Sequence, residues 1–427
     1  MLPRHRLSRD VFAALAAGGG GVDAMRELAA AEYSKHLTLL RGVLAAAQGD
    51  DEYHHARLGY DLLAAAWRKD RRAAETVIEY PAVGAWARRT IQACRAGLAL
   101  PGAEPGRLRA VAAAAAIRAR LPAEIEVAAI DGHVSLPSLG AVMVADSPVV
   151  VRSGGGRATV GHVEVPEHPY RDAPGWLGLR RVRVGSLDVV IDDLDPLRMP
   201  GARGLLPRQA ASWDAASWDA ALRRSWAVLE RHHPVVAAEI AAAVSVIVPL
   251  SRPMEGIAST TSPDVFGAIG MSLPSDAVLG AETLTHELQH VKLDALLDLV
   301  TLTLPDNGQS YYAPWRDDPR PLRGLLQGAY AFLGVSGFWR RQRLLASGGQ
   351  HADIVYARWR AAVALAIETL IGSGRLTSAG TEFVSSMAYT LADWLADPVT
   401  TEAEAAAQRA AQSHLARWRS VNGPNAV

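Results

Sequence analysis

The feature that most constrains the fold is the stretch HELQH, residues 286 to 290. Its two histidines are four residues apart, and in an α-helix that spacing places both imidazoles on one face, where they can bind one ion. The pattern His-Glu-x-x-His is expected by chance only about 0.02 times in a chain of this composition. We therefore expect His286 and His290 to be metal ligands on a helix. The alternative is a surface helix with two solvated histidines.

Two acidic residues of the same helix are placed to assist such an ion. Glu287 stands next to the first histidine and could act as a general base on a water molecule bound to the ion. Asp294 lies one turn beyond His290. Ligating histidines usually give their second N–H to a carboxylate or carbonyl, so Asp294 is a candidate second-shell partner. An ordinary solvated charge is the alternative for Asp294.

A catalytic metal usually has a third protein ligand. Common zinc peptidases take it from a glutamate on the next helix or from a histidine in HExxHxxGxxH. This chain continues as HELQHVKLDALLD, and the next expected helix, PLRGLLQGAYAFLGVSGFWRRQRLL, contains neither Glu nor Asp. Gln327 is the side chain on its expected inner face with a donor oxygen. We therefore take Gln327 as the candidate third ligand, with His351 and Glu368 of the following helix as the other acceptor side chains nearby. This departure argues against an ordinary peptidase.

The loop GQSYYAPWRDDPRPLRG joins these two helices and is rich in aromatic, arginine and proline residues. Tyr312, Arg316 and Arg320 are candidates for binding a cofactor carboxylate, because a guanidinium can hold a carboxylate through two hydrogen bonds. The alternative is that both arginines pair at the surface with the neighbouring aspartates 317 and 318.

The strand expected from FGAIGMSLP would lie at the edge of the cleft. Ser272, near its end, is a further candidate cofactor-binding residue, and the strand edge could pair with an extended peptide.

Hydrophobic patterning divides the chain into three parts. Residues 1–122 are alanine-rich with helical periodicity. Residues 123–200 have short β-branched runs separated by Gly, Pro and Asp, which is typical of a small antiparallel β unit. Residues 201–427 return to helices, with two strands before the motif helix. We predict an α+β, mainly helical fold with a helical metal-binding C-terminal domain. Its last helices are expected near 322–345, 352–371, 378–396 and 401–420.

Composition excludes several classes of protein. Lys+Arg and Asp+Glu are equal at 44 each, so there is no basic excess for nucleic acid. No uncharged run approaches the roughly 20 residues of a membrane span. The single cysteine, Cys94, permits neither an internal disulfide nor a cysteine zinc cluster, which favours the reducing cytoplasm.

The stretches LTHELQHVKLDALLDL and YYAPWRDDPRPLRGLLQGAYAFLG, with HRLSRDVFAALAAGGGG near the start, resemble a family of actinobacterial peptide-modification proteins that carry the HExxH motif. The resemblance covers most of the chain. Members occur alone or fused to radical-SAM enzymes, so such an enzyme is an expected second partner. At the position of Gln327 relatives tend to have histidine, and this chain departs from the family there.

The resemblance implies a hydroxylase that uses iron(II) and α-ketoglutarate to add a β-hydroxyl to a residue of a ribosomally made precursor peptide. His286 and His290 match the family's metal ligands, and Arg316 or Arg320 could bind the far carboxylate of α-ketoglutarate. Two other functions stay open. One is a zinc metallopeptidase that processes such a peptide with Glu287 as its base. The other is a peptide- or partner-binding subunit with a degenerate metal site.

Overall fold

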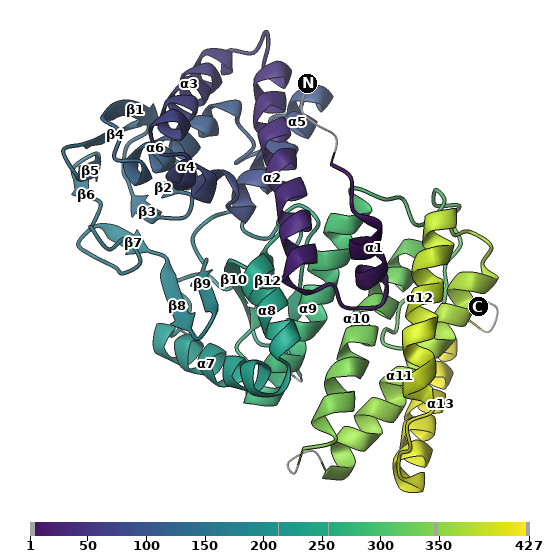
Figure 1. Cartoon of the computed structure of the whole chain (residues 1–427). Coiled ribbons are helices and arrows are strands. Elements are labelled where there is room, and N and C mark those ends of the chain that lie inside the picture. The colour runs from purple at the N-terminus through teal and green to yellow at the C-terminus, as the bar shows by residue number, and fades with distance from the viewer. Residues whose placement is uncertain (1–4, 212, 255, 346–348, 424–427) are drawn as a thin grey trace.

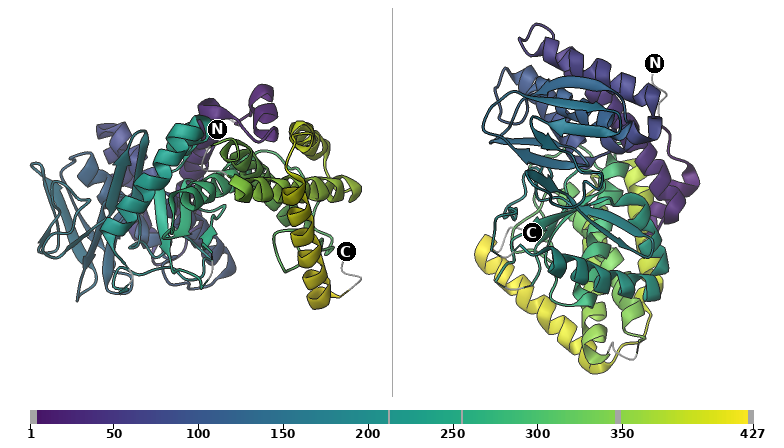
Figure 2. Two further views of the ribbon diagram at one scale, coloured as in Figure 1. Left: turned by 90° about the horizontal axis from the view of Figure 1, so that it is seen from below. Right: turned by 90° about the vertical axis from the view of Figure 1, so that its left-hand side faces the viewer.

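The computed structural model describes residues 5–423, apart from 212, 255 and 346–348. About 54% of the chain is helical and 14% is strand, so the predicted α+β, mainly helical class is confirmed. Figure 2 places the β strands and the C-terminal helices at opposite ends of the molecule. Among the described residues, no helix is long and apolar enough to cross a membrane.

The N-terminal region is helical, as predicted. Its elements are α1 (Arg9–Ala16), α2 (Gly21–Ala46), α3 (Tyr53–Lys69), α4 (Arg71–Ile78), α5 (Pro81–Ala96), the 3-10 turn η1 (Pro105–Arg107) and α6 (Leu108–Arg118). Ser8 and Asp70 cap α1 and α4 by accepting backbone N–H groups. The alanine-rich α6 is buried on nearly all sides, so it lacks the apolar stripe of a surface helix.

Strands follow from residue 123. They are β1 (Ala123–Val127), β2 (His133–Leu136), β3 (Gly140–Met143), β4 (Val149–Gly154), β5 (Arg157–Val160), β6 (Val163–Glu164), β7 (Trp176–Gly178), β8 (Arg180–Val184) and β9 (Leu187–Ile191). The first seven form two antiparallel sheets, with strand orders β1-β4-β5-β6 and β2-β3-β7. Gly155 and Gly156 turn the β4–β5 hairpin, and both have positive φ, as a two-residue turn requires.

The hairpin β8–β9 does not stay with the other antiparallel strands. It joins a mixed sheet of order β11-β12-β10-β9-β8, which also contains β10 (Val246–Leu250), β11 (Ser259–Thr260) and β12 (Ala268–Ser272). Strand β10 runs parallel to both β9 and β12. A parallel neighbour needs a crossover, which α7 (Ala215–His232) and α8 (Pro234–Ala243) supply between β9 and β10. The strands of the expected β unit at 123–200 therefore belong partly to the two antiparallel sheets and partly to the mixed sheet.

The mixed sheet separates two hydrophobic cores. Ile247 and Ile269 point into the core shared with α7, α8 and the motif helix α9 (Ala277–Leu297). Their neighbours Val246 and Val248 point into the core that contains α3–α6 and the antiparallel strands. Every residue of β10 and β12 is buried, as expected for strands covered on both faces.

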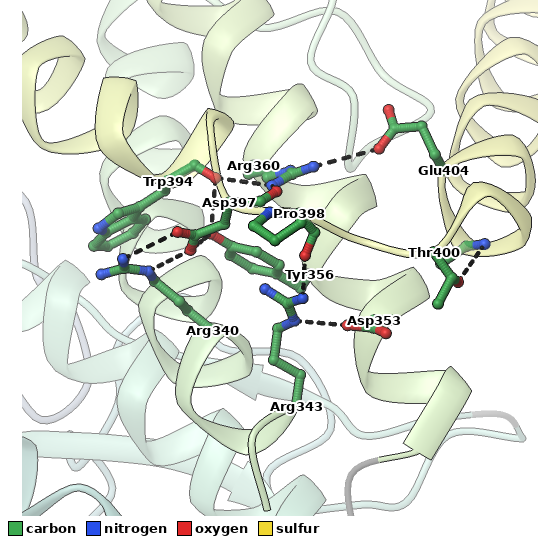
Figure 3. Close-up of polar contacts among 11 residues, drawn as sticks. Arg340, Arg343, Asp353, Tyr356, Arg360, Trp394, Asp397, Pro398, Thr400 and Glu404 are labelled. Carbon is green, nitrogen blue, oxygen red and sulfur yellow. Dashed lines mark hydrogen bonds and ion pairs between the residues drawn. The ribbon is translucent and has the colours of Figure 1, made fainter.

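The C-terminal helices are α10 (Leu322–Gln342), α11 (Gly349–Gly372), α12 (Ser378–Leu395) and α13 (Thr401–Asn422), close to the predicted ranges. Figure 3 shows the polar contacts that join their ends. Asp397 accepts hydrogen bonds from Arg340 Nε at 2.6 Å and from the Tyr356 hydroxyl at 2.8 Å. Arg360 donates to the Trp394 carbonyl at 2.8 Å. These contacts fix the turn between α12 and α13 against α10 and α11.

The N-terminal segment packs into the C-terminal half (Figure 1). Phe12 of α1 contacts Phe383 of α12, and the Tyr330 hydroxyl donates to the Leu15 carbonyl at 2.7 Å. Lys292 of α9 donates to the carbonyls of Gly18 and Gly19 and to Glu239 Oε2. The boundaries of the two hydrophobic cores therefore differ from the expected domain boundaries at residues 122 and 200. The helix α1 and the start of α2 pack into the core of the C-terminal helices.

Candidate metal centre

The two histidines converge on one face of α9, as their spacing predicts. Asp276, four residues after the end of β12, caps this helix by accepting a hydrogen bond from the Leu279 N–H. The imidazole rings of His286 and His290 lie at an interplanar angle of 71°, and their Nε2 atoms are 3.2 Å apart. The same two atoms can share one proton in a hydrogen bond or one metal ion.

The geometry fits a metal ion. A tetrahedral ion with metal–nitrogen bonds of about 2.0–2.1 Å holds two ligand nitrogens about 3.3 Å apart. Burial, and secondarily the neighbouring His290, lower the pKa of His286 from 6.5 to about 3. His286 is therefore neutral at physiological pH, which is the form that binds a metal.

A side-chain relay orients His290 from behind. Its Nδ1 lies 3.1 Å from Gln327 Oε1, and Gln327 Nε2 donates to Asp294 Oδ1 at 2.6 Å. The amide oxygen can only accept, so Nδ1 carries the proton and Nε2 presents its lone pair toward His286. Gln327 thus contacts the nitrogen that faces away from the pair. In this arrangement it acts as a positioning residue rather than as the predicted third ligand.

Asp294 occupies the predicted second-shell position, but it reaches His290 through Gln327 rather than directly. Burial raises the pKa of Asp294, whereas His290, Gln327 and Arg323 lower it. The carboxyl is therefore part of a half-buried chain of side chains in which each polar group has a neighbour.

Glu287 lies beside the pair with an unused acceptor. Its Oε1 is 3.9 Å from His286 Nε2, and the residue is only 2% exposed. Burial raises the pKa of Glu287, while His290 and then the hydroxyls of Ser259 and Thr261 lower it. Within the described part of the chain, Glu287 Oε2 has no hydrogen-bond partner. A buried acceptor without a donor is unusual, and it leaves this carboxyl able to take up a proton.

Aromatic rings close another side of the pair. Phe332 of α10 packs edge-on against His286, with ring centroids 5.1 Å apart. The ring of Trp315, in the connecting loop, stacks on that of Phe332 with centroids 4.9 Å apart, and the ring of Trp359 of α11 lies 4.3 Å from that of Phe332.

Over residues 5–423 without the five undescribed positions, no group of three His, Cys, Asp or Glu residues is arranged to hold a metal. The side next to His286 is therefore apolar.

The loop between α9 and α10 reaches this aromatic wall through Trp315, which fits against Gly328, where a side chain would collide with the indole. The two arginines of this loop, Arg316 and Arg320, form ion pairs with a neighbouring aspartate. Arg316 Nε donates to Asp318 Oδ1 at 2.7 Å, and Arg320 Nη1 donates to Asp318 Oδ2 at 3.3 Å. The surface alternative weighed for these arginines is thus the arrangement observed, with Asp318 shared by both.

The other two predicted cofactor-binding residues are also engaged within the protein. The Tyr312 hydroxyl lies 2.7 Å from His414 Nδ1 of α13, so it faces the last helix. Ser272 is fully buried, and its Oγ accepts the Ala258 N–H at 3.0 Å. The edge of β12 expected to receive a peptide is covered by β11, which pairs Ser259 with Met271.

Sequence reasoning missed Phe332, Trp359, Ser259 and Thr261. None belongs to a motif, and an aromatic residue in an apolar helix has no signal that separates a site wall from ordinary core.

Neither the models of known protein families nor the curated proteins include a match to this chain.

Proposed function

We propose that the chain is a metal-dependent enzyme that hydroxylates the β-carbon of a residue in a ribosomally made peptide, with iron(II) and α-ketoglutarate as cofactors. The observation that carries the proposal is the convergence of His286 Nε2 and His290 Nε2 at 3.2 Å. The single cysteine, which favours a reducing compartment, supports action in the cytoplasm.

His286 and His290 would hold iron(II), which would supply, with α-ketoglutarate and dioxygen, the oxidising power for C–H hydroxylation. The protein residues hold and shield the centre. Gln327 and Asp294 keep His290 in the ligating tautomer. Phe332 and Trp315 exclude water from one side. Arg316 or Arg320 would bind the far carboxylate of α-ketoglutarate in exchange for Asp318.

The test is an anaerobic titration with iron(II) and α-ketoglutarate, followed by exposure to air with the precursor peptide encoded beside this chain. The peptide should gain one oxygen atom by mass spectrometry, with one succinate formed per hydroxylation. His286→Ala should lose both metal binding and turnover. A peptide that gains no mass with iron and α-ketoglutarate but is cut with zinc would overturn the proposal.

A second candidate, zinc-dependent hydrolysis of such a peptide, is favoured by Glu287. Its buried carboxyl, with Oε1 3.9 Å from His286 Nε2 and a pKa raised by burial, suits a general base acting on a metal-bound water. Glu287→Gln should then abolish cleavage while the metal remains bound. Full cleavage by that variant would eliminate the hydrolase.

A third candidate, a peptide- or partner-binding subunit such as a companion of a radical-SAM enzyme, is favoured by the apolar Phe332 where a third ligand could stand. Metal analysis of protein purified without added metal distinguishes it. No bound metal, together with retained peptide binding, supports this candidate over both enzymes.

A further inference from the structure

A groove lies in the other half of the molecule, between the end of α6, the β4–β5 hairpin and the segment after β6. It encloses about 720 Å³. Four arginines line it, Arg118, Arg120, Arg157 and Arg181, together with two glutamates, Glu164 and Glu167. Its lining includes none of the residues of the histidine centre.

Arg118 is held rigidly in the wall without a counter-charge. Its Nε donates to Ser138 Oγ at 2.8 Å, and its Nη2 donates to the Ser138 carbonyl at 2.6 Å and to the Tyr170 hydroxyl at 2.9 Å. All three acceptors are neutral, and Nη1 makes no hydrogen bond to any described residue. A guanidinium fixed by neutral groups, with one nitrogen unused, is preorganised for an anionic ligand.

Two further arginines add to this charge. Arg120 and Arg157 are exposed, and neither forms an ion pair with a residue in the described ranges. Arg181, by contrast, is neutralised by Asp188, to which it donates from both Nε and Nη2. Three cations without a carboxylate partner among the described residues therefore line the groove, together with two glutamates.

The shape favours an extended ligand. A second hollow of about 210 Å³ shares Arg118, Tyr170 and Arg181 with the first and continues toward Glu79. A nucleic acid would need an open aromatic face for its bases. Tyr170, the aromatic residue that the two hollows share, has one face covered by Arg181, with the guanidinium carbon 4.9 Å from the ring centroid. Tyr80, which also lines the second hollow, is buried and donates its hydroxyl to Asp192.

We propose that this groove binds an extended acidic peptide segment, whose carboxylates pair with Arg118, Arg120 and Arg157. A phosphodiester chain, with a charge on every unit, would also meet the glutamates. A peptide can space its carboxylates to avoid them, while its amide groups face Glu164 and Glu167. This docking site is separate from the histidine centre, so it can be tested on protein without metal.

The test uses the full-length chain and a fluorescein-labelled peptide of about ten alternating Glu and Ala residues, measured by fluorescence anisotropy. A double variant, R120Q with R157Q, should raise the Kd about tenfold or more. Arg118 is left intact because it also supports the Ser138 turn. The double variant E164Q with E167Q should lower the Kd, an effect that a folding defect would not produce.

Arg152→Gln is the matched control. Arg152 is an exposed arginine of the same β4–β5 hairpin, paired with Glu124 outside the groove, so its loss should leave the Kd unchanged. The proposal is overturned if the acidic peptide shows no saturable binding. It is equally overturned if R152Q weakens binding as much as the groove variants do, or if a single-stranded oligonucleotide or inorganic phosphate competes better than the unlabelled peptide.

Discussion

Replacing Gln327 by leucine tests the relay behind His290. Leucine has a similar volume but can neither accept from His290 Nδ1 nor donate to Asp294, so contacts of 3.1 Å and 2.6 Å are both lost. The imidazole is then free to rotate and to place its proton on either nitrogen. Only the tautomer with the proton on Nδ1 can bind an ion between the two Nε2 atoms.

The expected loss is in metal affinity. Removing an outer-shell partner of a ligating histidine typically weakens metal binding about 10- to 100-fold, or about 1.4–2.8 kcal/mol. The cost to folding is smaller, about 1–2 kcal/mol. Burial raises the pKa of Asp294 and the hydrogen bond from Gln327 lowers it, so the variant should raise this pKa further.

Isothermal titration calorimetry with zinc at neutral pH measures the affinity of the parent and of each variant. Gln342→Leu is the matched control, since Gln342 is another glutamine of α10 with a side-chain partner, its Nε2 lying 3.3 Å from the Nε2 of His233. Unchanged zinc affinity in Gln327→Leu, or an equal loss in the control, would refute the relay. A loss as complete as that of His290→Ala would instead make Gln327 a ligand.

Three further predictions concern stability. Lys292→Met should lower the free energy of unfolding in urea by about 3–5 kcal/mol, because the Glu239 carboxylate stays buried without its cation; a loss below about 1 kcal/mol would contradict this. Burial lowers the pKa of His36 from 6.5 to about 4. The unfolded chain therefore binds the extra proton between these pH values, and stability should fall by up to about 3 kcal/mol as the pH drops from 6.5 to 4. His36→Gln should flatten this part of the curve, and a parallel curve would exclude His36 as the cause. Asp397→Asn should lower the Tm through loss of the ion pair with Arg340, which is partly exposed and therefore worth about 0.5–1 kcal/mol; an unchanged Tm in thermal unfolding would show that the pair contributes nothing.

Local patterns predicted the elements well. The helices after residue 320 and the strands β10 and β12 lie where periodicity placed them, because period and length are properties of a short window. The partner of a strand, by contrast, cannot be inferred from a short window of sequence. The alternating residues of β8 and β9 indicate a hairpin, but nothing in them distinguishes an antiparallel neighbour from the parallel β10 that follows two helices later.

The same division applies to the candidate site. His286 and His290 converge because their spacing within one helix is sufficient. The role of Gln327 depends on how α10 crosses α9, which decides which imidazole nitrogen the amide meets. The surroundings of Ser272 could not be predicted for a related reason, since the short β11 that covers its strand carries no strong pattern.

The packing of α1 against the last helices has a consequence for synthesis. Gly18 bonds to Gln289, 271 residues later, and Ala17 bonds to Thr390, 373 residues later. The first helix therefore leaves the ribosome long before the surfaces that receive it exist. Contacts of such long range form slowly and leave apolar surface exposed meanwhile. The C-terminal core, which contains the histidine pair, can be completed only after α12 has been made, so we expect the histidine pair to reach its native surroundings only after α12 has been synthesised.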